Sequence, residues 1–74
     1  MKYMVTEYQD NGTTVGNQFF AFDSPLDAES KYYAILSAAA VSKVPIHTAY
    51  LETSDGRYID SKSYDHRQSD SQDA

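Results

Sequence analysis

One stretch bounded by two prolines constrains the fold of this chain more than any other feature. Ser24 is a good N-cap residue, and Pro25 suits the first position of a helix. Pro45 forbids the helix from continuing past it. We therefore expect one helix from Pro25 to Ser42 or Lys43, with the lysine placed favourably for the helix dipole.

The segments on either side of this helix have the pattern of β-hairpins. Asn11-Gly12 in the first segment and Asp55-Gly56 in the second are strong signals for two-residue hairpin turns. Gly16 is a candidate β-bulge within the second run. The β-forming runs expected from the sequence are residues 2–9, 13–22, 44–53 and 58–64.

This order predicts an α+β domain of the ββαββ type. The simplest arrangement is a four-stranded antiparallel sheet with the helix packed on one face, and strand order 2-1-3-4 keeps all neighbours antiparallel. At 74 residues the chain has room for one small domain, which we place at residues 1–64. Residues 65–74 are polar, have nothing to bury, and are expected to form a disordered tail.

The predicted helix has two apolar stripes rather than one. The first is expected to face the sheet and contains Ala28, Tyr32, Ile35, Leu36 and Ala39. The second lies nearly opposite and contains Ala34, Ala38 and Val41. Alanine is the best helix former, so this second stripe has two explanations: helix propensity alone, or a seam for contact with another chain.

The strands leave the same choice open, because aromatic residues alternate onto both faces of a sheet that has one helix to cover it. Seven tyrosines occur in 74 residues. Tyrosine tolerates partial exposure, so the second face can simply be wet; it also supplies much contact area at low entropic cost, which favours an interface. The candidate interface residues are Tyr8, Phe20, Phe22, Ala34, Ala38, Val41, Tyr50 and Tyr58.

Residues for catalysis or metal binding are sparse. The chain has no cysteine, and its two histidines, His47 and His66, have no neighbour at metal-ligand spacing. Glu52 and Asp60 could face each other across the second hairpin, but exposed strand carboxylates are usually solvated surface. We therefore expect no enzyme activity, no catalytic residue, no cofactor and no metal site.

Charge and hydropathy bear on partners and location. The net charge of −5 argues against a nucleic-acid partner. No apolar run approaches the roughly 20 residues of a membrane span, and Met1-Lys2-Tyr3 leads directly into a β-forming run without a signal-peptide pattern. Together with the absence of cysteine, this predicts a cytoplasmic protein with no membrane partner.

Residues 27–64 resemble a group of short uncharacterised proteins encoded by low-GC Gram-positive gut bacteria and by their phages and mobile elements. The residues that carry the resemblance are Ala28-Glu29-Ser30-Lys31-Tyr32, Ile35-Leu36, Ala38-Ala39-Ala40-Val41-Ser42, Val44-Pro45-Ile46-His47, Gly56, Ile59 and Tyr64. The resemblance implies a stand-alone accessory protein of a phage or mobile element. It implies no activity, and it carries no functional residue over to this chain.

The leading functional expectation is a non-enzymatic interaction protein that forms a homodimer and binds a macromolecular partner, such as a host or phage protein. The first alternative is an oligomeric binder of a small nucleotide-like ligand, held by Lys31, Arg57 and Lys62 from two copies. The second is a virion or assembly component.

Overall fold

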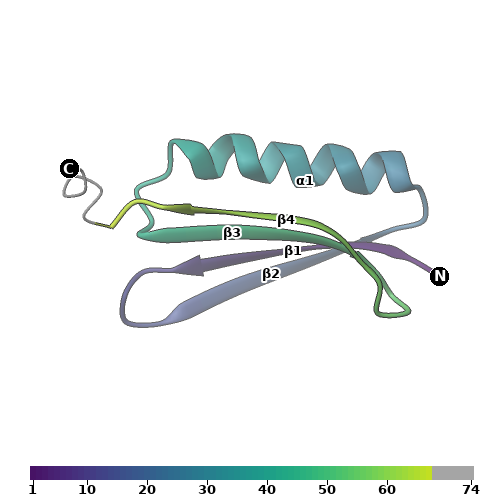
Figure 1. The fold of residues 1–74 in the computed structure, drawn as a ribbon, viewed down its shortest axis with the longest axis horizontal. Helices are drawn as coiled ribbons and strands as arrows, with labels where there is room; N and C mark the ends of the chain where they lie inside the picture. Colours follow the sequence, from purple (N-terminus) through teal and green to yellow (C-terminus); the bar gives the residue numbers. More distant parts are fainter. Residues whose placement is uncertain (68–74) are drawn as a thin grey trace.

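A computed structural model describes residues 1–67 of the chain (Figure 1). Two hairpins flank one helix, and the element order ββαββ expected from the sequence is confirmed. The elements are β1 (Tyr3–Asp10), β2 (Val15–Phe22), α1 (Pro25–Ala40), β3 (Ile46–Thr53) and β4 (Tyr58–Asp65).

The strands form one antiparallel sheet in the order β2-β1-β3-β4, as predicted. The two hairpins therefore join through their first strands, β1 and β3, which lie at the centre. The strands β2 and β4 are the two edges. Figure 1 shows the helix lying lengthwise along one side of the sheet, and no element of residues 1–67 lies on the other side.

Strand register decides which side chains lie under the helix. Val5 on β1 is opposite Phe20 on β2 and Leu51 on β3, and Leu51 is in turn opposite Asp60 on β4. Since directly opposed residues point to the same face of an antiparallel sheet, this row shares the face covered by α1. We call that side the helix face and the opposite side the outer face.

The core lies between α1 and the central strands. The five buried residues of the helix, Ala28, Tyr32, Ile35, Leu36 and Ala39, are those predicted from its periodicity. Four of them, all except Ala39, form one cluster with Val5 of β1 and with Ala49 and Leu51 of β3. Small side chains at Ala28, Ala39 and Ala49 let the helix approach the sheet closely, and Tyr32 fills the space between them.

The helix begins as predicted and ends earlier than predicted. Ser24 is the N-cap, and its Oγ accepts a hydrogen bond from the Asp27 amide at 3.4 Å. The last helical residue is Ala40, not Ser42 or Lys43. Ser42 Oγ accepts a hydrogen bond from the Val44 amide at 2.9 Å, a local side-chain bond of the kind that competes with a helical backbone.

Both turns are longer than the predicted two-residue turns. Asp10 pairs with Val15, so the first loop spans residues 11–14, and Asn11 Oδ1 accepts hydrogen bonds from the amides of Thr13 and Thr14. This side-chain bonding holds Thr13 and Thr14 in the loop rather than in β2. Gly16 pairs with Gln9 in an unbroken register, so the predicted bulge there is wrong.

The second turn is a three-residue loop over residues 54–56. The Thr53 amide bonds to the Arg57 carbonyl at 2.9 Å, and Gly56 adopts a φ of 94°, which favours glycine. An irregularity follows, because Glu52 pairs with Tyr58 while Leu51 pairs with Asp60. The extra residue, Ile59, puts Glu52 and Asp60 on opposite faces, so the predicted approach of these two carboxylates is wrong.

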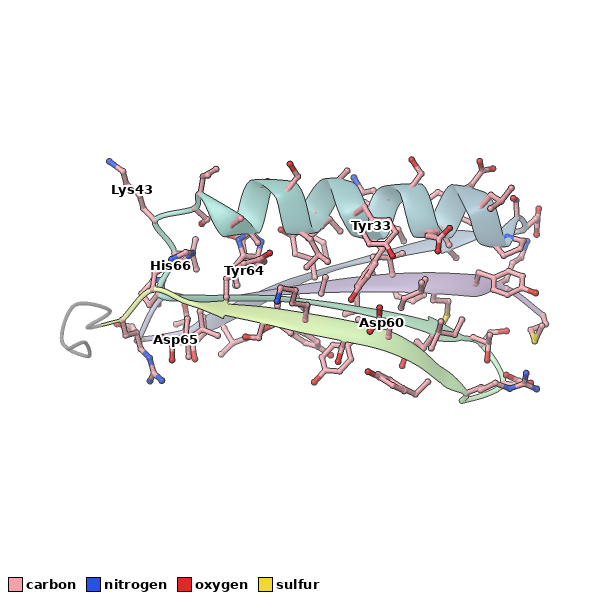
Figure 2. The ribbon with its side chains drawn as sticks, turned by 45° about the horizontal axis from the view of Figure 1, so that its top comes forward. Tyr33, Lys43, Asp60, Tyr64, Asp65 and His66 are labelled. Atoms are coloured by element: carbon pink, nitrogen blue, oxygen red, sulfur yellow. The ribbon has the colours of Figure 1, made fainter. Side chains whose placement is uncertain are left out.

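The folded domain extends beyond the predicted boundary at residue 64. Asp65 is the last residue of β4, and the His66 amide donates to the Pro45 carbonyl at 2.6 Å. The His66 ring stacks on Tyr64 and its Nε2 bonds to the Ala39 carbonyl at the helix end, at 2.9 Å. Figure 2 shows Tyr64 and His66 near the helix, with Asp65 on the other side of β4. The rest of the predicted tail, residues 68–74, lies outside the described residues.

Because Tyr32 is buried, the stability of the fold is expected to vary with pH in the alkaline range. Desolvation, with a smaller contribution from the Asp60 charge, raises the pKa of Tyr32 to about 12. Between the unfolded pKa of about 10 and this value, the unfolded chain loses a proton that the folded chain keeps, so raising the pH favours unfolding.

We predict that the free energy of unfolding falls by on the order of 2 kcal/mol between about pH 10 and pH 12 because of Tyr32 alone. The measurement is urea denaturation of the wild type and of Tyr32→Phe across that range. As pH rises, the free energy of unfolding of the wild type should fall relative to that of Tyr32→Phe. If the two change in parallel, Tyr32 does not carry the effect.

Candidate interaction surface

No other element of residues 1–67 covers the outer face of the sheet. It presents four side chains from each strand. These are Val15, Asn17, Phe19 and Ala21 of β2; Met4, Thr6, Tyr8 and Asp10 of β1; Ile46, Thr48, Tyr50 and Glu52 of β3; and Tyr58, Ser61, Ser63 and Asp65 of β4. Half of these side chains are apolar or aromatic.

The apolar members concentrate on β2, β1 and β3. Phe19 is 61% exposed and Val15 is 60% exposed, although both are large hydrophobic residues. Tyr8 and Tyr50 stand side by side on the central strands, with ring centroids 5.8 Å apart and planes at 88°, which is a favourable edge-to-face contact. These rings border a shallow hollow of about 390 Å³ that also includes Val15 and Ile46. We call the outer-face residues Val15, Phe19, Tyr8, Ile46 and Tyr50 the apolar strip. The contact between Tyr8 and Tyr50 lies at its centre.

Strand β4 gives the outer face a hydroxyl-rich margin. Thr48 Oγ1 donates to Ser63 Oγ at 2.9 Å, and the hydroxyls of Tyr58 and Ser61 are 3.2 Å apart. Such hydroxyls can exchange their partners for those of a bound molecule. The outer face therefore divides into an apolar strip and a polar margin along one edge.

The charges of the outer face are acidic. Asp10 and Glu52 border the hollow at opposite ends, and no lysine or arginine lies among its lining residues. At the margin, Arg67 forms a two-point contact with Asp65, at 3.0 Å from Nε and 2.8 Å from Nη2. The bound guanidinium lowers the pKa of Asp65 to about 2, so this carboxyl stays ionised at neutral pH. The face suits an apolar or basic group better than a phosphate.

The eight predicted interface residues fall in three separate places. Tyr8, Tyr50 and Tyr58 lie on the outer face. Ala34 and Ala38 are exposed on the side of α1 away from the sheet, and Val41, the residue after the end of the helix, is exposed as well. Phe20 and Phe22 lie on the helix face, where they are partly buried against the core. Placing these two phenylalanines with Tyr8 was wrong.

The number of residues in the hairpin loop explains why Phe20 and Phe22 do not share a face with Tyr8. A hairpin loop with an even number of residues opposes odd residues of β1 to even residues of β2, as in the pair of Val5 and Phe20. Both the predicted two-residue loop and the observed four-residue loop obey this rule. Phe20 and Phe22 therefore share a face with Val5, while Phe19 and Val15, which were not predicted as interface residues, share the outer face with Tyr8.

A polar cluster lies on the helix face near the end of α1. His47 is 4% exposed, and its Nε2 lies 2.5 Å from Glu7 Oε2. Gln9 Nε2 donates to the same carboxylate oxygen at 3.0 Å, while His47 Nδ1 is buried without a hydrogen-bond partner. No serine or other nucleophile is hydrogen-bonded to the histidine among residues 1–67.

The basic residues considered for a nucleotide-like ligand do not meet within one chain. The Lys31 ammonium lies over the Phe20 ring at 4.3 Å from its centroid, and the Lys62 ammonium lies over the Tyr64 ring at 5.0 Å. Arg57 follows the turn between β3 and β4. Within residues 1–67 no group of three or more His, Cys, Asp or Glu side chains is placed to hold a metal ion.

Comparison with known proteins does not add a relative. No protein-family model, no curated protein and no solved structure matches the chain. The resemblance to the phage and mobile-element group stays a prediction. Among the described residues, no helix is long and apolar enough to cross a membrane.

The pair of Glu7 and His47 yields a stability prediction. Glu7→Ala leaves both ring nitrogens of the buried His47 without a partner and also removes the acceptor of Gln9. We expect this variant to lose about 1 to 3 kcal/mol in the free energy of unfolding, measured by urea denaturation. The double variant Glu7→Leu/His47→Leu should recover most of the loss, because it leaves no buried imidazole nitrogen without a partner. A loss under about 0.5 kcal/mol for Glu7→Ala would mean that water satisfies His47.

Proposed function

We propose that this chain is a non-enzymatic interaction protein that self-associates and binds a protein partner through the outer face of its sheet. The observation that carries the proposal is the apolar strip around Tyr8 and Tyr50, with Phe19 and Val15 largely exposed beside it. Large apolar patches rimmed by polar residues typically mark protein–protein contact sites.

The size of the face supports this proposal. Four strands at about 4.8 Å spacing and eight residues at about 3.4 Å rise define a plane of roughly 500 Å². A plane of this size is below the roughly 800 Å² per partner of a standard interface and corresponds to the smaller interfaces of transient complexes. Tyrosine at the centre and hydroxyls at the margin match the usual arrangement of such interfaces.

Charge indicates the kind of partner. Asp10 and Glu52 flank the apolar strip, and the whole chain carries a net charge of −5. A partner surface with apolar side chains at its centre and lysine or arginine at its rim is complementary to this arrangement. Nucleic acid, which is a polyanion, is not. A host or phage protein remains the proposed class of partner, and an accessory role in a phage or mobile element remains part of the proposal.

The proposal predicts that Tyr50→Ala weakens partner binding by about 2 kcal/mol or more, because a central aromatic anchor is lost. The immobilised chain is used to capture proteins from cells that produce it, with nuclease present, and the affinity of each captured protein is then measured. Ala38→Glu, on the exposed side of the helix, serves as the matched control and should bind like the wild type.

Capture of the same proteins by wild type and Tyr50→Ala would count against the outer face as the binding site. Loss of binding in Ala38→Glu alone would instead assign the contact to the helix stripe of Ala34, Ala38 and Val41. Capture that occurs only when nuclease is omitted would contradict a protein partner.

A further inference from the structure

The two edges of the sheet differ in their protection against pairing with another strand. Strand β2, VGNQFFAF, carries no charged residue and no proline along its eight residues. Strand β4, YIDSKSYD, carries Asp60, Lys62 and Asp65, and its pairing with β3 is irregular between Leu51 and Glu52. Charges and irregularities are the usual means by which proteins block an edge strand. Only β4 has them.

Strand β2 is also open to solvent along most of its length. Its residues from Val15 to Phe19 are all exposed, and only Phe20 and Phe22 are partly buried. The helix packs mainly over the central strands. At this edge the core covers Phe20 and Phe22 in part and leaves the stretch from Val15 to Phe19 exposed. A row of unpaired backbone N–H and C=O groups on an uncharged strand rich in phenylalanine is a template for strand addition.

We propose that the β2 edge pairs antiparallel with β2 of a second copy, across a twofold axis perpendicular to the sheet. The result is a continuous eight-stranded sheet in the order 4-3-1-2-2-1-3-4, with both helices on the same side. This inference rests on the self-association in the proposed function and says which part of the molecule makes it. It can fail while the outer face still binds a protein partner, because it concerns the sheet edge alone.

A second copy fits this edge because the strand is complementary to itself. Antiparallel pairing keeps the two faces continuous only if even residues oppose even residues, which places the axis at a residue rather than between two. With no charge on β2, no like charges of the strand itself meet across the axis even though each chain carries −5 overall. The Lys31 ammonium of α1 lies nearby, 4.3 Å from the centroid of the Phe20 ring.

The register centred on Phe19 has a further advantage. It sets Phe19 against its own copy and sets Gly16 against Phe22 of the second copy. Gly16 has open space where a side chain would begin, with no atom within 4 Å. An aromatic ring opposite a strand glycine covers exposed backbone and stabilises the pairing. This register therefore compensates for the weakest residue of β2.

Such a contact closes on itself. Because the same edge is used by both copies, the remaining edges of the dimer are the two β4 strands, whose charges and irregular pairing oppose further addition. The arrangement predicts a dimer rather than a filament.

The absence of cysteine in the chain permits a clean cross-linking test. The Phe19→Cys variant is oxidised in parallel with a control variant, Ser63→Cys. The control places its thiol on the outer face of the other edge strand, β4. Opposed residues of an antiparallel pair lie about 4.5 to 5.5 Å apart between Cα atoms, which suits a disulfide. We expect Phe19→Cys to form covalent dimer several-fold faster than Ser63→Cys. A mixture of Asn17→Cys and Ala21→Cys should cross-link faster than either variant alone, since these residues are opposed in the Phe19 register.

Light scattering provides the independent measurement. The wild type should have twice the 8.3 kDa mass of the chain, and Gln18→Lys, which adds a charge to the edge without changing the outer face, should be monomeric. The proposal is overturned if Phe19→Cys and Ser63→Cys cross-link equally, if the wild type is monomeric, or if Gln18→Lys stays dimeric. The outer-face proposal is judged separately, because Gln18→Lys leaves Tyr8 and Tyr50 in place.

Discussion

One helix has to cover a sheet of four strands, and the rest of the structure depends on that mismatch. Sixteen residues give α1 a length of about 24 Å, close to the roughly 27 Å of an eight-residue strand. The widths do not match, because a helix about 10 Å across lies on a sheet roughly 19 Å wide. The helix therefore buries the central strands on one side and covers the edge strands only in part, at Phe20, Phe22 and Tyr64. Among residues 1–67 it leaves the whole outer face without a cover.

The elements that the sequence specifies by local chemistry were predictable. Ser24 and Pro25 start the helix, and the periodicity of its apolar residues identified all five of its buried side chains. Alternation of two hairpins and one helix allowed few sheet orders, and the simplest of them is observed. These features depend on interactions between residues close in sequence, or on topology that the short connections restrict.

The lengths of the two loops and the strand register after the second loop were not predictable from the Asn-Gly and Asp-Gly signals. Asn-Gly and Asp-Gly indicate a turn correctly, but the bonds of Asn11 to Thr13 and Thr14 lengthen the first loop, and Ile59 shifts the register after the second. The anchoring of His66 to the helix end joins residues far apart in sequence, and no periodic pattern signals it. One part of the candidate site was predictable from the sequence. An even number of loop residues in the first hairpin puts Phe20 on the same face as the core residue Val5, and it puts Phe19 on the face of Tyr8.

The division of the outer face gives the proposed pairing a functional meaning. In one chain the apolar strip is off-centre: Val15 and Phe19 lie at the open β2 edge, and Ser61, Ser63 and Asp65 lie at the other. Pairing through β2 would bring the two strips together at the middle of an eight-stranded sheet and leave the hydroxyl and acidic margins at its two ends. That is an apolar centre with a polar rim, the arrangement of a specific protein interface. In the proposed dimer, pairing at the β2 edge would join the outer faces of two chains into one surface. A single chain would present half of that surface.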